Sequence, residues 1–263
     1  SRFAATWQIW GMRGYTLAEL AKQPLADNIP QGYDSVRTGP REFQWRADQG
    51  AEVIWAQAQD GGDMKTDVPH HDYLYSLRAP FKRDPKLFAK VERRFDSIEW
   101  GNNNVALLSE WRFSDRQLRT YVIQPRNADR NRVLFSDRSY NDAYKDPGKP
   151  IYERNDLGVS VIKVVGGRYV FLRGNGASEQ GNIPFLDRYD VKTNSKTRIW
   201  QSAAPYYERI RAMLDDEGER LITIRESKTE QPNFFIRDLG DDTLTQLTTF
   251  EHPYPEFKGV TKE

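Results

Sequence analysis

Hydrophobic and polar positions in this chain form short alternating runs bounded by Gly, Asp, Asn and Pro, with almost no long stretch at helical spacing. Such runs predict β-strands. One arrangement recurs along the chain: an alternating run, a tight turn, and then a second, more hydrophobic run. Its four copies lie at 43–55, 98–108, 151–162 and 210–224. The pattern therefore predicts a series of antiparallel hairpins.

A second hairpin-like pair follows each copy and is clearest at Pro184–Trp200 and Asn233–Leu247. Units of four antiparallel strands that recur roughly every 55 residues are typical of a β-propeller. A partial unit precedes them, in Thr6–Trp10 and Tyr15–Leu20. The alternative is a β-sandwich with accidental spacing, but a sandwich of this size has no internal register. The predicted fold is all-β, a partial β-propeller of about four and a half blades.

The repeats suggest blade boundaries and a functional face. Blades are expected at about 1–30 (partial), 31–95, 96–140, 141–203 and 204–250, which gives a partial propeller over 1–250 and a linker over 251–263. Because strands within a blade alternate in direction, the longest loops should share one face. These loops are 32–41, 60–72, 140–148 and 174–181. Function is expected on that face, since loops held by a rigid scaffold carry most binding residues.

Composition excludes several classes of function. Aromatic residues reach 13%, which argues against disorder and suits half-buried sheets. Lys and Arg number 39 against 38 acidic residues, so no field of one sign is available to hold a nucleic acid. The chain has no Cys, and no apolar run approaches the roughly 20 residues that span a bilayer. We expect no nucleic-acid partner and no membrane partner.

Residues that could catalyse hydrolysis are few. The histidines are His70, His71 and His252, and no Gly-x-Ser-x-Gly motif occurs. Ser178 lacks the strand-to-helix context of a nucleophile elbow. A complete serine-hydrolase site within this chain is therefore not expected.

Metal and phosphate motifs are also weak. His70 and His71 lie near Asp67 and Asp72, but adjacent side chains of an extended chain point to opposite sides, which favours a polar loop. The segment 60–63, Asp-Gly-Gly-Asp, lacks the ligand series of a calcium loop and is better explained by turn chemistry. The Gly-Asn-Gly at 174–176 does not match a phosphate-binding fingerprint. We predict no cofactor and no metal.

Arginines on or near the loop-rich face are the more suggestive groups, because guanidinium suits bidentate capture of carboxylates. They are Arg37, Arg41, Arg112, Arg116 and Arg119. The alternative for each is an ion pair between blades or a solvated surface charge.

Several segments closely resemble the propeller of the glutamyl endopeptidases, a branch of the prolyl oligopeptidase family of serine peptidases. They include Pro24-Leu-Ala-Asp-Asn-Ile-Pro30, Ser35-Val-Arg-x-Gly-x-Arg41, Trp45-Arg-Ala-Asp48, Gln59-Asp-Gly-Gly-Asp63, Asp142-x-Tyr-x-Asp-Pro-Gly148, Gly174-Asn-Gly-Ala177, Gly181-Asn-x-Pro-Phe-Leu-Asp187, Glu226-Ser-Lys-Thr-Glu230 and His252-Pro-Tyr-Pro255. Matches in this order cover nearly the whole chain from about Trp10 onward.

This resemblance implies a seven-bladed propeller followed by an α/β-hydrolase domain that carries a Ser, Asp and His triad. Here the hydrolase motifs and the first blades are missing, and the chain opens at Ser1 without Met, so we interpret it as a piece of the peptidase that is inactive alone. By resemblance, the propeller limits substrate entry and contributes contacts to acidic peptides. Residues 259–263 resemble the linker into the missing domain.

Arg37 and Arg41 are the predicted substrate-binding residues. They precede an expected innermost strand that borders the channel, where a buried carboxylate needs a charged, hydrogen-bonding partner.

Two other functions remain open: a stand-alone propeller scaffold that binds a protein partner, and, ranked last, a glycosidase, although no carboxylate pair stands out. The expected partners are a peptide substrate, the missing hydrolase domain and the missing blades. Blades exposed at broken ends should also promote self-association. A periplasmic or exported parent is favoured over a cytosolic one, although the absence of Cys suits either.

Overall fold

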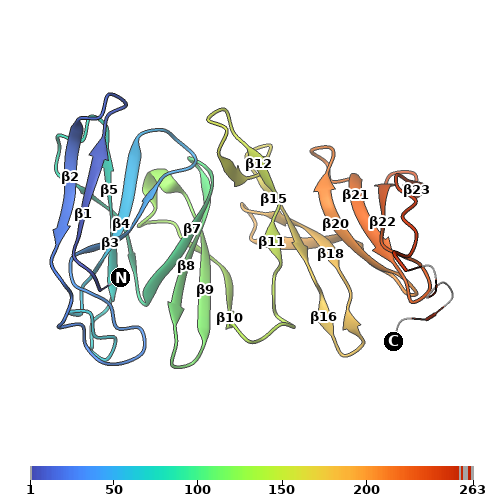
Figure 1. The fold of residues 1–263 in the computed structure, drawn as a ribbon, viewed down its shortest axis with the longest axis horizontal. Coiled ribbons are helices and arrows are strands. Elements are labelled where there is room, and N and C mark those ends of the chain that lie inside the picture. The colour runs from blue at the N-terminus through green and yellow to red at the C-terminus, as the bar shows by residue number, and fades with distance from the viewer. Residues whose placement is uncertain (1, 255, 257–259, 262–263) are drawn as a thin grey trace. The chain divides into compact units, whose positions relative to one another are not determined.

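The computed structural model describes residues 2–254, 256, 260 and 261. The predicted linker, 251–263, therefore lies partly outside the described residues. Contacts divide the chain into two compact units. Unit 1 contains residues 1–141 and 154–161, and unit 2 contains residues 142–153 and 162–263. Each unit is described separately below (Figure 1).

Unit 1 contains two four-stranded antiparallel sheets and a two-stranded one. The pair β1 (Ala5–Trp10) and β2 (Thr16–Gln23) forms the predicted partial unit. The first full sheet consists of β3 (Pro40–Trp45), β4 (Glu52–Ala58), β5 (Asp72–Arg78) and β6 (Lys86–Val91). The second consists of β7 (Arg94–Asn102), β8 (Val105–Arg112), β9 (Gln117–Ile123) and β10 (Val133–Ser139), with the 3₁₀ turn η1 (Pro125–Asn127) between its last two strands.

Apolar side chains pack these sheets face to face. One cluster joins Ile9 of β1 to Trp55 of β4 and Leu77 of β5. A larger cluster lies between the two four-stranded sheets and includes Ile54 and Leu74 from one and Leu108 and Ile123 from the other. Burial of both sheet faces explains why the second strand of each hairpin is more hydrophobic than the first.

Unit 2 repeats this architecture. One sheet contains β11 (Lys149–Pro150), β14 (Val164–Val165), β15 (Tyr169–Gly174), β18 (Phe185–Asp190) and β19 (Ser195–Gln201). The next contains β20 (Tyr207–Met213), β21 (Arg220–Glu226), β22 (Asn233–Asp238) and β23 (Thr243–Gln246). Phe171 and Leu186 pack against Ile210 and Leu221 in the cluster that joins the two sheets.

Two short hairpins lie between strands of the first of these sheets in sequence, and most of the first hairpin, residues 154–161, belongs to unit 1. They are β12 (Tyr152–Arg154) with β13 (Ser160–Ile162), and β16 (Ala177–Ser178) with β17 (Gly181–Asn182). The predicted hairpin at 151–162 does form, as β12 with β13, but the prediction that it is the first hairpin of the third four-stranded unit is wrong. The inner strand is split into β11 and β14, and its neighbour is β15. The tight turn between β14 and β15 is made by Gly166 and Gly167, both at positive φ.

Consecutive antiparallel four-stranded sheets that pack face on face are propeller blades. The fold is all-β, a portion of a β-propeller, as the repeats predicted. No helix within the described residues is long and apolar enough to cross a membrane.

Candidate functional site

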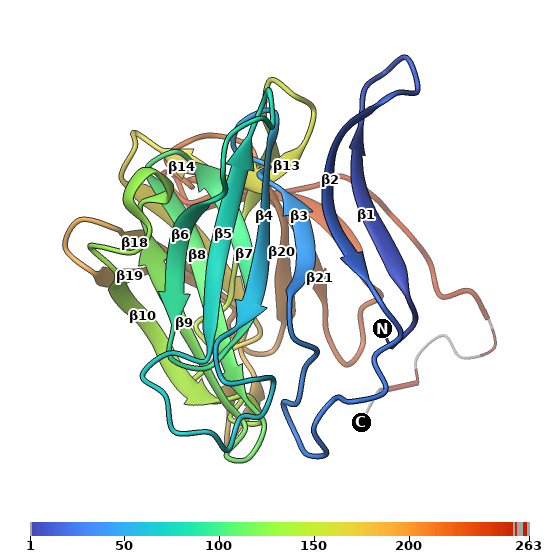
Figure 2. The same ribbon diagram turned by 90° about the vertical axis from the view of Figure 1, so that its left-hand side faces the viewer.

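Loops gather at one end of the strands of unit 1. Figure 2 shows the blue connection from β2 to β3 and the teal connection from β4 to β5 at the same end of the strands. The amide of Val36 in the first donates to the carbonyl of Gly62 in the second, at 3.0 Å. The carboxylate of Asp34 accepts from the amide of Phe113 in the β8–β9 turn, at 2.7 Å. We call residues 31–39, 59–71, 92–94 and 113–116 the loop-end surface.

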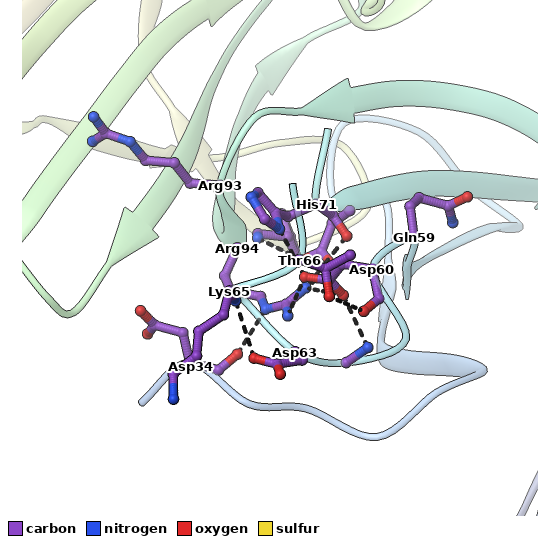
Figure 3. Close-up of polar contacts among 12 residues, drawn as sticks. Asp34, Gln59, Asp60, Asp63, Lys65, Thr66, His71, Arg93 and Arg94 are labelled. Atoms are coloured by element: carbon purple, nitrogen blue, oxygen red, sulfur yellow. Dashed lines mark hydrogen bonds and ion pairs between the residues drawn. The ribbon is translucent and has the colours of Figure 1, made fainter. Parts of the chain in front are cut away.

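Arg94, the first residue of β7, ties these loops together (Figure 3). Its guanidinium donates to both carboxylate oxygens of Asp60, at 3.1 and 2.6 Å, and to Asp72 at 3.1 Å. Its Nε donates to the carbonyl of Asp34 at 2.7 Å. One buried side chain therefore fixes the 59–71 loop, the start of β5 and the 31–39 loop.

Asp60 also organises its own loop. Its carboxylate accepts from the amide of Gly62 at 2.9 Å, and its carbonyl accepts from the hydroxyl of Thr66 at 3.1 Å. Gly61 and Gly62 adopt positive φ angles of 68° and 86°. The structure thus confirms that turn chemistry explains the Asp-Gly-Gly sequence.

The charge state of Asp60 follows from its neighbours. Burial alone would raise the pKa of Asp60, but the hydrogen bonds from Arg94 and His71 outweigh burial and hold this pKa below its usual value. The Nδ1 atom of His71 lies 2.7 Å from Asp60. Asp60 is therefore ionised near neutral pH, and its pairing with Arg94 is a buried, charge-assisted contact.

The two arginines predicted to bind substrate have partners within the chain. Arg41, in β3, is buried and pairs with Asp72, whereas its Nη1 is buried without a hydrogen-bond partner. Arg37 donates to the carbonyl of Pro24 at 2.7 Å and to that of Phe3 at 3.4 Å. Neither geometry tests substrate binding, so this assignment stays a prediction.

The other three predicted arginines occupy different surroundings. Arg112 pairs with Asp115 in the β8–β9 turn, which holds the pKa of Asp115 at about 2. Arg119 lies 2.9 to 3.3 Å from the carboxylates of Glu92, Glu110 and Asp137. Arg116, whose backbone lies at a φ of 58°, stacks on the ring of Phe113, with Cζ 3.5 Å from the ring centroid.

Sequence reasoning missed Arg93. This residue lies between β6 and β7, and its side chain points away from the Asp60–Arg94 contacts (Figure 3). It is only 7% exposed, yet its Nη1 atom has no hydrogen-bond partner. The sequence signal for Arg93 was the charged triplet Glu-Arg-Arg at 92–94, which separates two apolar runs. Only residues 92 and 93 connect the two strands, and so short a connection leaves their side chains few directions.

The remaining polar candidates have local roles. The ring of His70 lies 6.2 Å from that of Tyr73, so it diverges from His71, which contacts Asp60. The hydroxyl of Ser178, at the tip of a short hairpin, donates to the carbonyl of Gly181 at 2.8 Å. Among the residues that the structure describes, no three His, Asp or Glu side chains gather in a way that could hold a metal ion.

Comparison with known proteins identifies close relatives among plant peptidases. A protein of Arabidopsis thaliana named "Probable glutamyl endopeptidase, chloroplastic" is 36% identical over 278 residues, covering 100% of this chain and 29% of that protein. The protein of the same name from Oryza sativa subsp. japonica is 37% identical over 277 residues, covering 100% of this chain and 30% of that protein. The chain thus spans less than a third of the length of these relatives. No family model matches it.

Solved structures show weaker likeness. TolB from Acinetobacter baumannii is 12% identical with a TM-score of 0.35, over 92% of this chain and 53% of that one. The β-propeller domain of the Trilobed protease from Pyrococcus furiosus is 9% identical with a TM-score of 0.40, over 79% and 56%. Likeness at this level supports no conclusion, so kinship rests on the plant sequences. Over its whole length the chain is similar to a segment of plant proteins named as probable glutamyl endopeptidases, and in this chain that segment folds as a portion of a β-propeller.

Proposed function

We propose that this chain serves as the non-catalytic propeller part of a glutamyl endopeptidase-like serine peptidase. In this proposal an α/β-hydrolase domain supplies the catalytic residues, the loop-end surface limits which substrates enter, and arginines on or next to this surface bind acidic peptides. The names of the plant relatives support the peptidase class and the acidic preference.

The observation that carries the gating proposal is the fixed position of the two long loops. Arg94 holds Asp34 and Asp60 from one point, and the Val36–Gly62 hydrogen bond joins the loops directly. Loops that served only as solvated connections would not need a buried ion pair to hold them. A loop-end surface whose loops are held in place can, by contrast, exclude large substrates without first having to become ordered.

The proposal for acid binding keeps Arg37 and Arg41. In Arg41 the Nη1 atom has no partner, although Nη2 is committed to Asp72. The Nη1 group of Arg41 is therefore available to donate to a second carboxylate while Nη2 stays bonded to Asp72.

Substitution of Gly62 by alanine tests the gate. A Cβ at this position would overlap the carbonyl oxygen of Val36, so the two loops should separate. In the peptidase polypeptide that contains this chain, we expect cleavage of a long, unstructured protein to rise several-fold relative to cleavage of a short fluorogenic peptide. Faster hydrogen exchange at the Val36 amide would report that the loops have parted.

Gly61→Ala is the matched control. Gly61 also has positive φ, but a Cβ there meets nothing within 4 Å, so this variant carries the backbone strain without the clash. Equal long-to-short cleavage ratios in the Gly62 variant, the Gly61 variant and the wild type, with exchange at Val36 accelerated only in the first, would show that these loops do not gate substrates.

A further inference from the structure

Arg93 is a buried cation whose side chain has no acidic partner among the described ion pairs. Its backbone amide donates to Glu110 at 3.3 Å, which fixes the start of its side chain. Its guanidinium is desolvated, and Nη1 has no hydrogen-bond partner. An arginine keeps its charge even when buried, and an unpaired buried charge is costly, so such a group has a strong affinity for an anion.

The carboxylates near Arg93 already form ion pairs with other arginines. The guanidinium of Arg119 donates to Glu110 at 3.3 Å and to Asp137 at 3.1 Å. Arg112 is held by Asp115. Burial, followed by the charges of Arg119 and Arg112, lowers the pKa of Arg93, and these effects exceed the opposing effects of Glu110 and Asp137. At Arg93 itself, therefore, the neighbouring arginines have more influence than the neighbouring carboxylates.

We propose that Arg93 is a specificity-determining residue that binds the side-chain carboxylate of an acidic residue in the peptide substrate. This inference rests on the proposed function. The guanidinium of Arg94 donates to Asp60, Asp72 and the carbonyl of Asp34. The Arg93 side chain points away from these contacts, which favours Arg93 over Arg94 as the residue that binds substrate (Figure 3). A carboxylate from the peptide would supply the partner that the chain does not.

The test compares two fluorogenic peptides that differ only by Glu or Gln at the scissile position, cleaved by the peptidase polypeptide that contains this chain. Glu and Gln are nearly isosteric, so the ratio of their kcat/KM values reports recognition of charge. For Arg93→Gln we expect kcat/KM to fall on the order of 100-fold with the Glu peptide and to change little with the Gln peptide. Arg93→Lys, which keeps the charge, should retain part of the preference for Glu.

Arg112→Gln is the matched control, because Arg112 is a nearby arginine already paired with Asp115. It should leave the Glu-to-Gln ratio unchanged. If Arg93→Gln lowers kcat/KM equally for both peptides, Arg93 pairs with another part of the protein and the inference is overturned. The same holds if the ratio collapses in Arg41→Gln but survives in Arg93→Gln. A wild-type enzyme that cleaves both peptides equally well would instead contradict the proposed acidic preference, and the role of Arg93 would fall with it.

Discussion

Replacement of Asp72 by alanine is expected to lower the free energy of unfolding by about 3–5 kcal/mol, the usual cost of breaking a buried ion pair. Asp72, at the start of β5, is 0% exposed and accepts from Arg41, from Arg94 at 3.1 Å and from the amide of Phe95 at 2.8 Å. Its removal would leave two buried guanidinium groups undercompensated and one buried amide without its acceptor. Urea unfolding of the purified chain, followed by tryptophan fluorescence, measures this loss.

Asp115→Ala provides the comparison. Asp115 also pairs with an arginine, Arg112, but both side chains are 41% exposed, so its loss should cost within about 1 kcal/mol. Asp72→Asn should fall between the two, because the amide oxygen can still accept from Phe95. A cost for Asp72→Ala no greater than that for Asp115→Ala would mean that the ion network does not hold the loop-end surface.

Leu108→Ala is expected to cost about 3 kcal/mol or more, through lost burial and the cavity left behind. Leu108 is 0% exposed in β8 and belongs to the cluster between the two four-stranded sheets of unit 1. Close packing across two sheets gives the neighbouring side chains little freedom to fill the space. The same urea titration measures the effect.

Leu134→Ala, in β10 of the same sheet, removes the same atoms from a side chain that is 46% exposed. It should cost only about 0.5 kcal/mol, as surface substitutions usually do. Comparable losses at both positions would contradict the assignment of the core.

Strands and hairpins could be predicted because they depend on local pattern. The run 105–108 is more hydrophobic than 98–100, and β8 is correspondingly buried on both faces. The third repeat misled the prediction because a short hairpin, β12 with β13, carries the same alternation and a turn of its own. Local pattern shows that a hairpin exists, but the sheet that it joins depends on contacts distant in sequence.

The candidate site could be predicted only in part. The loops expected on one face do meet in unit 1, and the Asp-Gly-Gly turn was interpreted correctly. The pairing of Arg94 with Asp60 and Asp72 was not predicted, because Asp60 lies 34 positions and Asp72 lies 22 positions before Arg94 in the sequence. Contacts between residues distant in sequence decide whether an arginine forms an ion pair within the chain. Arg93 was therefore overlooked in favour of Arg37 and Arg41.

Cleavage of a fluorogenic peptide with Glu at the scissile position tests the central claim most directly. The assay compares this purified chain with a polypeptide in which the chain continues into the proposed hydrolase domain. The account predicts cleavage by the longer polypeptide and none by the chain alone. Cleavage by the chain alone would contradict the non-catalytic role, and cleavage by neither would contradict the peptidase assignment and favour a protein-binding scaffold.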